Sequence, residues 1–418
     1  MTVAASTLGQ DVRVIGLVGI AHGYSHFYQM ILPPVFILLK AEFDVSFAAL
    51  GLLATVLYAA SGTGQLIAGF LVDRIGAKPV LLFGLTVCAG STLGFSFARD
   101  YQTLVVLSLG VGIGMSVFHP ADLSILTLKV NPSRLGRAYA VHALCGNLGW
   151  AVAPPFVVGL TALYDWRMAA AMAGVVGLLY VALMLLRSRD WAVEANAVTM
   201  DETAEAADNE SFAADVRLLA SAPVVLCFCY FTFFAMAMVG MQNFGALSLM
   251  KLHGLPFASA TAVLTAFLIA SAVGVFIGGI IADRTPRHHA LAMVGTALGS
   301  IFMFGVATVS GVAFAVPALM ILSGFAIGLT MPSRDMIVRK VAPEGKTGRV
   351  FGFVYAGLDL GSLAMPVLLG WLLDRGDPKM AMLVVAAVLL VTVATVMQVG
   401  RRSADPARET AYTSRLNC

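Results

Sequence analysis

Charged side chains are scarce in this chain. Asp, Glu, Lys and Arg make up 12% of its 418 residues, and hydrophobic residues make up 59%. A soluble domain carries about 25% charged residues. So few charges cannot cover a water-facing surface, which argues against a soluble enzyme or a soluble binding module. We therefore expect most of the surface to be in contact with lipid.

Cysteine and phosphate-binding motifs are also scarce. Four of the five cysteines lie in long hydrophobic segments, which excludes an exposed disulfide framework and leaves no Cys-rich metal cluster. No Walker-type loop occurs, so ATP does not drive the protein directly. Polar segments are too short to form a soluble catalytic domain. The sequence therefore predicts no enzyme activity, no cofactor and no metal site. The cysteines are Cys88, Cys145, Cys227, Cys229 and Cys418.

What the chain does contain is a series of long apolar runs. A membrane span needs roughly 20 apolar residues, and the sequence divides into twelve such runs. These runs are too long for strands, and helices satisfy their own backbone in lipid, so we expect an all-α membrane protein with twelve transmembrane helices. The expected spans are 14–39, 47–72, 79–98, 102–126, 136–161, 167–187, 222–249, 258–282, 288–309, 313–336, 347–373 and 379–400.

The placement of basic residues predicts the orientation of these spans. With both termini in the cytoplasm, 19 of the 26 Lys and Arg residues fall on the inner side and six on the outer side, and Arg334 lies within a span. Such an excess of inner positive charge is the general rule for membrane proteins. The short basic clusters flank spans, so we expect a bilayer and no nucleic acid as partner. We predict an inner-membrane protein with both termini cytoplasmic.

The chain also repeats itself. The pair Asp73-Arg74 recurs as Asp283-Arg284, 210 positions later. Duplicated sets of spans are typical of secondary transporters, whose substrate site lies between the two repeats. We therefore predict two pseudo-symmetric six-helix bundles in a monomer. The expected parts are an N-terminal bundle (1–187), an acidic cytoplasmic linker (188–221), a C-terminal bundle (222–400) and a cytoplasmic tail (401–418).

The loop after the second span has a distinctive pattern, Gly69-Phe-Leu-Val-Asp73-Arg74-Ile-Gly-Ala-Lys78. It resembles the signature loop of the major facilitator superfamily, and residues 279–287 resemble its second copy. The resemblance covers essentially the whole chain and implies the major facilitator fold.

In this family the loop acts as a conformational latch. The resemblance implies that the Asp73 carboxylate lies at the N-terminus of the eleventh span, where a negative charge is favourable. It also implies an acidic partner for Arg74 or Lys78 at the inner end of the fourth span, where Asp122 lies. Asp335 is the corresponding partner for Arg284. The expected latch residues are Gly69, Asp73, Arg74, Lys78, Asp122, Asp283, Arg284 and Asp335.

Two further motifs resemble the fosmidomycin-resistance-like branch of this superfamily. The first span contains His22-Gly-Tyr-Ser-His26 before two prolines, and the fourth contains Phe118-His119-Pro120. His26 stands where that branch has an acid, and Ala121 where it has Glu. Both changes fall on candidate proton-handling positions, so the drug specificity of the branch is not transferred.

Ionisable groups within spans are costly and are by default functional candidates. His22 and His26 share one helix face, and imidazole titrates near neutrality. Asp359 lies in the middle of its span, and Arg334 could attract an anionic substrate. Structural hydrogen bonding is the alternative for each. The expected proton-coupling or substrate residues are His22, His26, Gln29, His119, His142, Asn147, Gln242, Asn243, Arg334, Tyr355 and Asp359.

Together these features favour a secondary active transporter that works by alternating access. The leading expectation is proton-coupled export of a small organic solute across the inner membrane, with protons as the second partner. The alternative is proton-coupled or facilitated uptake of a small organic anion. A non-transporting membrane scaffold or sensor is the competing class.

Overall fold

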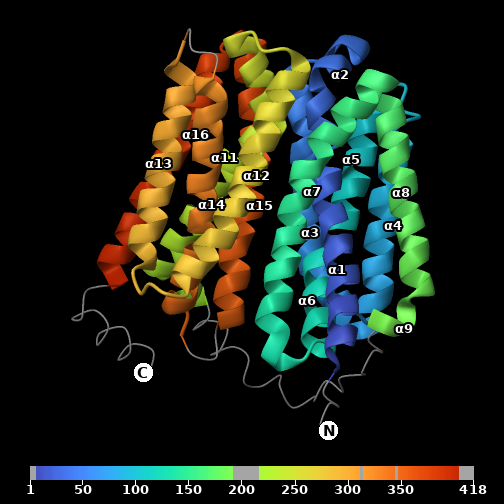
Figure 1. Ribbon diagram of the computed structural model, residues 1–418, viewed down its shortest axis with the longest axis vertical. Helices are drawn as coiled ribbons and strands as arrows, with labels where there is room; N and C mark the ends of the chain where they lie inside the picture. Colours follow the sequence, from blue (N-terminus) through green and yellow to red (C-terminus); the bar gives the residue numbers. More distant parts are fainter. Residues whose placement is uncertain (1–5, 192–215, 311–313, 344–346, 404–418) are drawn as a thin grey trace. The chain divides into compact units, whose positions relative to one another are not determined.

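The computed structural model describes residues 6–191, 216–310, 314–343 and 347–403 (Figure 1). In these ranges every regular element is a helix. The α-helices are α1 (Leu8–Gln29), α2 (Phe36–Phe43), α3 (Phe47–Ile75), α4 (Ala77–Phe95), α5 (Tyr101–Met115), α6 (Phe118–Lys129), α7 (Leu135–Leu163), α8 (Trp166–Leu186), α9 (Ser188–Trp191), α11 (Ala222–His253), α12 (Phe257–Ala282), α13 (His288–Thr308), α14 (Ala315–Val341), α15 (Thr347–Asp374) and α16 (Pro378–Ser403), with 3₁₀ turns at Pro33–Val35 and Pro132–Arg134.

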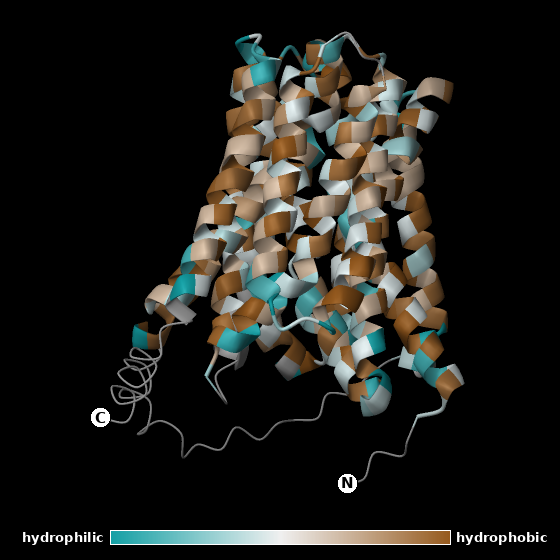
Figure 2. Ribbon diagram, turned by 60° about the vertical axis from the view of Figure 1, so that its left-hand side comes forward, coloured by the Kyte–Doolittle hydropathy of each residue, from teal (hydrophilic) through white to brown (hydrophobic). Residues whose placement is uncertain are grey.

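Most of these helices are built to cross a membrane. In the described part, 11 segments are long and apolar enough to do so. Apolar residues fill the middle of the long helices, and polar residues gather near their ends (Figure 2). In lipid a spanning segment must satisfy its own backbone, which helices do. The prediction of an all-helical, multi-pass membrane protein is confirmed.

Two of the predicted spans are divided by proline. The expected span 14–39 consists of α1, a 3₁₀ turn that begins at Pro33, and α2. The expected span 102–126 consists of α5 and α6, which meet at Ser116 and Val117. Pro120 has no N–H to donate to the carbonyl of Ser116, and its ring crowds that carbonyl, so the helix is interrupted there. Each break divides one expected span into two helices, and Tyr101–Lys129 is still a single segment long and apolar enough to cross a membrane.

The described residues group into two compact units. In the first unit, α1 packs on α7, and α4 packs on both α5 and α8. In the described part of the chain this unit comprises 6–191, 241–269 and 366–378, and the second comprises 216–240, 270–310, 314–343, 347–365 and 379–403. Within the second unit α13 packs on α14. Residues 192–215 of the predicted linker and 404–418 of the predicted tail lie outside the described residues.

Glycine permits very close contact between α1 and α7. A Cβ on Gly149 of α7 would lie 2.1 Å from the carbonyl oxygen of Gly23 of α1. A Cβ on Gly159, further along α7, would meet nothing within 4 Å. Small residues allow backbones to approach in this way in membrane proteins. Gly149 therefore sets the distance between the two helices.

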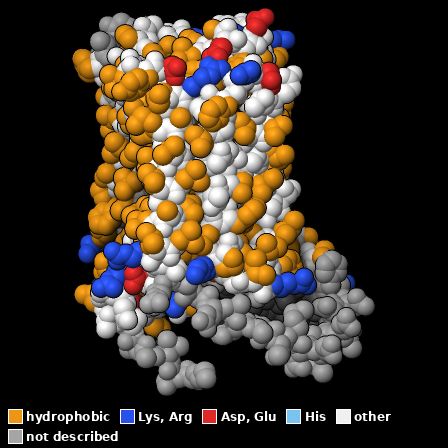
Figure 3. Space-filling model, turned by 90° about the vertical axis from the view of Figure 1, so that its right-hand side faces the viewer, with side chains coloured by type: hydrophobic (Ala, Val, Ile, Leu, Met, Phe, Trp, Pro, Cys, Tyr) orange, Lys and Arg blue, Asp and Glu red, His pale blue; other side chains and the backbone are white. Residues whose placement is uncertain are grey.

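The outward face of α8 is apolar. Val175, Leu179, Leu183 and Leu186 are all exposed along it. Figure 3, which faces this side of the molecule, shows hydrophobic side chains over the middle of the helices and charged side chains near both ends. An apolar band between charged rims is the surface that a bilayer requires.

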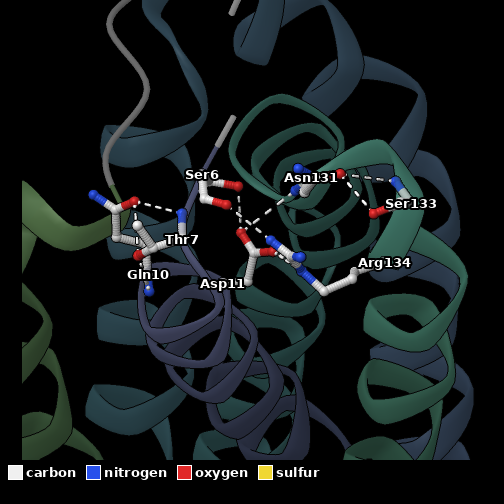
Figure 4. Close-up of polar contacts among 7 residues, drawn as sticks. All are labelled: Ser6, Thr7, Gln10, Asp11, Asn131, Ser133 and Arg134. Atoms are coloured by element: carbon white, nitrogen blue, oxygen red, sulfur yellow. Dashed lines mark hydrogen bonds and ion pairs between the residues drawn. The ribbon is translucent and has the colours of Figure 1, made fainter. Parts of the chain in front are cut away.

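A polar cluster fixes the start of α1 (Figure 4). The buried carboxylate of Asp11 accepts a hydrogen bond from Ser6 Oγ at 2.6 Å and pairs with Arg134 Nε. Arg134 also donates to the backbone oxygen of Ser6 at 2.8 Å. Asn131 N donates to Asp11 at 3.4 Å. These contacts tie the first turn of α1 to the segment between α6 and α7.

The charge of Asp11 stabilises this cluster, and its effect should depend on pH. Burial favours the neutral acid, but hydrogen bonds from Ser6, Arg134 and Asn131 outweigh it and hold the pKa of Asp11 below its ordinary value. A carboxyl with a lowered pKa stabilises the fold above its unfolded pKa of about 3.9, and this contribution is lost as the pH falls through the folded-state value. We expect Asp11→Asn to cost about 1.5–3 kcal/mol at pH 7, as for hydrogen bonds to charged groups.

Thermal unfolding in detergent, followed by tryptophan fluorescence, measures this effect. The difference between wild type and Asp11→Asn should shrink below about pH 4. Asp44→Asn is the control, because Asp44 is exposed and lies at positive φ, where Asn is equally acceptable. Equal melting temperatures for all three proteins at pH 7 would contradict the prediction.

Candidate functional site

Four histidines and one carboxylate from three helices meet inside the first unit. α1 contributes His22 and His26, α6 contributes His119 and Asp122, and α7 contributes His142. Asp122 is completely buried, and His22 and His142 are nearly so. The sequence predicted all five as functional residues but did not predict that they meet. We call these five residues the histidine–aspartate cluster.

A single carboxylate oxygen lies at the centre of the cluster. Asp122 Oδ2 is 3.2 Å from His22 Nδ1 and 3.1 Å from His142 Nε2. The rings of His22 and His142 stack with their centroids 3.6 Å apart. The carboxylate therefore bridges two imidazoles that are themselves in contact.

Several polar atoms of the cluster have no hydrogen-bond partner among the described residues. These are Asp122 Oδ1, His22 Nδ1 and His26 Nδ1, all of them buried. His22 Nδ1 is within ion-pair distance of Asp122, but the angles do not make a hydrogen bond. Buried polar atoms are almost always paired, so unpaired ones call for a functional explanation.

The cluster also reaches an accessible surface. His119 is exposed, and its ring centroid is 5.1 Å from that of His22. The ring of His26 lies 4.6 Å from His22 in another direction and 4.3 Å from Trp150. A chain of imidazoles thus leads from the buried carboxylate to an exposed ring, and this arrangement suits proton exchange.

Gln29 extends this polar region along α1. Its Oε1 accepts hydrogen bonds from Trp150 Nε1 at 2.8 Å and from the Tyr58 hydroxyl at 3.4 Å. The remaining predicted polar residues of the first unit are more dispersed. Asn147 donates to the Ala143 carbonyl of its own helix. Gln242 and Asn243 are buried in α11.

A second ionisable group lies in the second unit, around Arg334 of α14. Arg334 is 5% exposed, and its Nε donates to Asp335 Oδ1 at 3.1 Å. Its guanidinium carbon lies 4.1 Å from the ring centre of Phe231, 5.2 Å from that of Phe234 and 5.9 Å from that of Tyr355. The two phenylalanines were not predicted, although their i,i+3 spacing on one helix indicates a shared face.

Asp359 lies on α15 in the same unit and is half-buried. In the described part of the chain it makes no hydrogen bond or ion pair. It is therefore an isolated carboxyl group, in contrast to Asp122.

The predicted latch residues do not pair as expected in the described part. Asp122 lies against His22 and His142, and neither Arg74 nor Lys78 forms an ion pair with a described side chain. Asp335 contacts Arg334, while Asp283 and Arg284 are exposed. Gly69 lies on α3 with open space around it. The side chain of Asp73 lies outside the described residues.

A different carboxylate, which the sequence did not reveal, lies at a helix N-terminus. Asp374 accepts hydrogen bonds from the backbone N–H groups of Phe47 and Ala48, each at 2.9 Å, at the start of α3. Lys40 Nζ is 3.1 Å from the same carboxylate. All four residues belong to the first unit. A negative charge is favourable there because the N–H groups of the first turn carry partial positive charge.

The cluster also has the composition of a metal site. His22, Asp122 and His142 each offer one ligand atom, and these atoms lie within 4.8 Å of one another. The sequence alone does not group these three residues, because Asp122 and His142 lie far from His22 along the chain. Only the packing of α6 and α7 against α1 brings them together.

Taken together, the helical spans and the buried ionisable groups define a multi-pass membrane protein of the transporter class. The sequence matches the Major Facilitator Superfamily over residues 18–262 and 226–414. This match spans nearly the whole chain, and the chain belongs to that superfamily.

Individual relatives agree with this assignment. The chain is 22% identical to the fosmidomycin resistance protein of Escherichia coli (strain K12), covering 94% of each chain. It is 25% identical to the 3-(3-hydroxy-phenyl)propionate transporter of the same organism, covering 81% of this chain and 82% of the relative. A bacterial homologue of the human lysosomal transporter Spinster, in an inward-facing and unoccupied conformation, has the same fold, with a TM-score of 0.79 at 16% identity over 95% of this chain and 98% of the other.

These similarities confirm the predicted family, its resemblance to a fosmidomycin resistance protein, and the major facilitator fold. The protein is a major facilitator superfamily transporter of small solutes.

Proposed function

We propose that this protein exchanges protons for a small organic solute across the inner membrane, with both termini in the cytoplasm. The histidine–aspartate cluster carries the proton. Alternating access moves the solute, and export is the direction that we favour. The protein works as a monomer without a bound metal or cofactor.

The observation that carries this proposal is the bridging carboxylate of Asp122. A completely buried carboxylate inside a lipid-solvated bundle is costly and is retained for a function. Its two imidazole partners have ring nitrogens that can pass a proton to or from the carboxylate. The exposed ring of His119, 5.1 Å from His22, offers an entry for protons. Asp359 is the second candidate for a proton carrier.

The names of the relatives support a small organic solute. One relative is named for resistance to fosmidomycin, which supports export, and another is named as a transporter of 3-(3-hydroxy-phenyl)propionate. Both belong to the superfamily that this chain matches along its length. The identities are too low to transfer either compound.

Proton movement in proteoliposomes tests the proposed function. A pH-sensitive dye inside the vesicles should respond when a transported solute is added, and the response should need the protein. Candidate solutes come from a thermal-shift screen, because a ligand of the folded state raises its melting temperature. Solute transport that never moves protons would overturn the coupling. The absence of any solute transport and of any conformational exchange would favour a non-transporting membrane scaffold or sensor.

The two helix-end carboxylates should act in opposite directions on the conformational equilibrium. We propose that Asp73 stabilises the outward-open state from the inner side and that Asp374 stabilises the inward-open state from the outer side. A charge at a helix N-terminus contributes about 0.3–2 kcal/mol, and the two states differ by only a few kcal/mol. Asp73→Asn should shift the population severalfold toward inward-open, and Asp374→Asn severalfold toward outward-open.

Distances between pairs of spin labels on the inner and outer sides measure this shift. Both variants should keep near-normal expression. A shift of the same sign in both variants, or an unchanged distribution in both, would contradict the proposal. Asp44→Asn again serves as the control for loss of an exposed carboxylate.

A further inference from the structure

We propose that Arg334 and the rings of Phe231, Phe234 and Tyr355 form the subsite for the carboxylate group of an organic acid substrate. This inference names the substrate class and rests on the proposed function for its role in transport. It concerns the second unit alone and uses none of the residues of the histidine–aspartate cluster.

The first argument is the free-energy cost of burying the charge of Arg334. Its side chain is 6% exposed, inside a helix that is apolar enough to span a membrane. A buried cation in such a helix is expensive and needs compensation. Its neighbour Asp335 supplies only one hydrogen bond, to Nε, and the Asp335 side chain is 39% exposed. A carboxylate pairs best with both nitrogens of one guanidinium edge, and Asp335 does not achieve this.

The second argument is the arrangement of the rings. Phe231 and Phe234 come from α11, Tyr355 comes from α15, and Arg334 comes from α14. The guanidinium carbon lies over all three rings, and Phe231 and Tyr355 also contact each other with centroids 5.1 Å apart. Rings within about 6 Å of a guanidinium attract it by cation–π interaction, and its N–H groups are the donors that a carboxylate needs.

The third argument is what such a site would select. A guanidinium presents a planar, always-charged donor edge that fits a carboxylate in bidentate fashion. The surrounding rings offer apolar walls for the rest of the molecule. Tyr355 is 37% exposed, so the site is open to a solute at this wall. The site therefore favours an organic carboxylate with an apolar or aromatic body over a neutral or cationic compound.

Binding in detergent tests this assignment without any transport. The probes are benzoate and 3-phenylpropionate, each compared with its neutral amide, measured by calorimetry and by thermal shift at constant ionic strength. Wild type should bind at least one carboxylate at least tenfold more tightly than its amide, since hydrogen bonds to charged groups are worth about 1.5–3 kcal/mol. Equal binding of acid and amide, or no binding of either acid, would overturn the inference.

Variants then assign the selectivity to Arg334. Arg334→Gln should lose at least tenfold in affinity for the acid and little for the amide, and Arg334→Lys should retain part of the preference because it keeps the charge but loses the planar fork. Arg375→Gln is the matched control, because Arg375 also lies over an aromatic ring, at 3.9 Å from Trp371, but is exposed. If Arg334→Gln does not fold, the affinities of Arg334→Lys and the acid–amide comparison on wild type still test whether Arg334 binds the carboxylate. If both Arg334→Lys and Arg334→Gln keep the wild-type preference for the acid over the amide, Arg334 does not bind the carboxylate.

The outcomes separate this inference from the proposed function. If the protein binds acids more tightly than amides but moves no protons in vesicles, the carboxylate subsite is supported and proton coupling is overturned. Proton movement driven by a solute that binds equally well as acid and amide would retain coupling and overturn the subsite.

Discussion

Asp122→Asn is expected to abolish solute-driven proton movement in proteoliposomes. Asparagine keeps the shape of the side chain and can still hydrogen-bond one of the two histidines that contact Asp122 Oδ2 at 3.1 and 3.2 Å. It cannot take up or release a proton near neutral pH. Coupled transport should fall to the level of protein-free vesicles, while counterflow exchange of labelled for unlabelled solute, which needs no net proton movement, should persist.

Two comparisons make this prediction specific. Asp359→Asn removes the second candidate proton carrier, and it should retain proton movement if the histidine–aspartate cluster carries the proton. If Asp359→Asn loses coupling and Asp122→Asn does not, the proton is carried by Asp359 on α15. A chelator should leave wild-type proton movement unchanged, because the proposal has no metal at His22, Asp122 and His142. Loss of coupling on chelation would overturn that part of it.

Gly149→Ala is expected to destabilise the protein strongly and to disturb the site. The added Cβ would lie 2.1 Å from the carbonyl oxygen of Gly23 and 3.1 Å from the Cβ of His26. Backbone atoms cannot yield locally, so α1 must move away from α7. Overpacking of this kind typically costs about 1–3 kcal/mol, which lowers the melting temperature by about 1–3 °C in a chain of 418 residues. Because His22 and His142 lie on these two helices, their stacking at 3.6 Å should also be lost.

Gly159→Ala is the matched control on the same helix. Nothing lies within 4 Å of its added Cβ, and alanine favours a helix over glycine by about 1 kcal/mol. Its melting temperature should stay equal or rise, and its coupled transport should match wild type. Equal melting temperatures for the two alanine variants would show that the close contact of α1 and α7 does not matter.

The class of the protein could be predicted from the sequence alone. Apolar runs of about 20 residues must be helical in lipid, whatever they pack against. The repeat of Asp73-Arg74 at Asp283-Arg284 is also written in the chain itself. The breaks within two of the spans also have a local cause, because the prolines at 33 and 120 interrupt their helices through their own ring and missing N–H.

The site depended on tertiary structure to a much greater degree. Sequence analysis selected His22 and His142 because ionisable groups in spans are rare, and it selected Asp122 separately through the family resemblance. It associated Asp122 with Arg74 or Lys78, because the family resemblance placed both at the inner ends of spans. Nothing in the sequence indicates that the rings of Phe231 and Phe234 on one helix lie next to Arg334 on another.

The physical reason is that the hydrophobic pattern fixes where a helix lies in the bilayer but not how it is rotated or which neighbour it touches. Rotation is decided by close packing, such as that of Gly149 against Gly23. His22 faces Asp122 of α6 and His142 of α7, which complete the cluster. The sequence determined a membrane transporter with buried ionisable groups, and only the packing of its helices decided which of those groups act together.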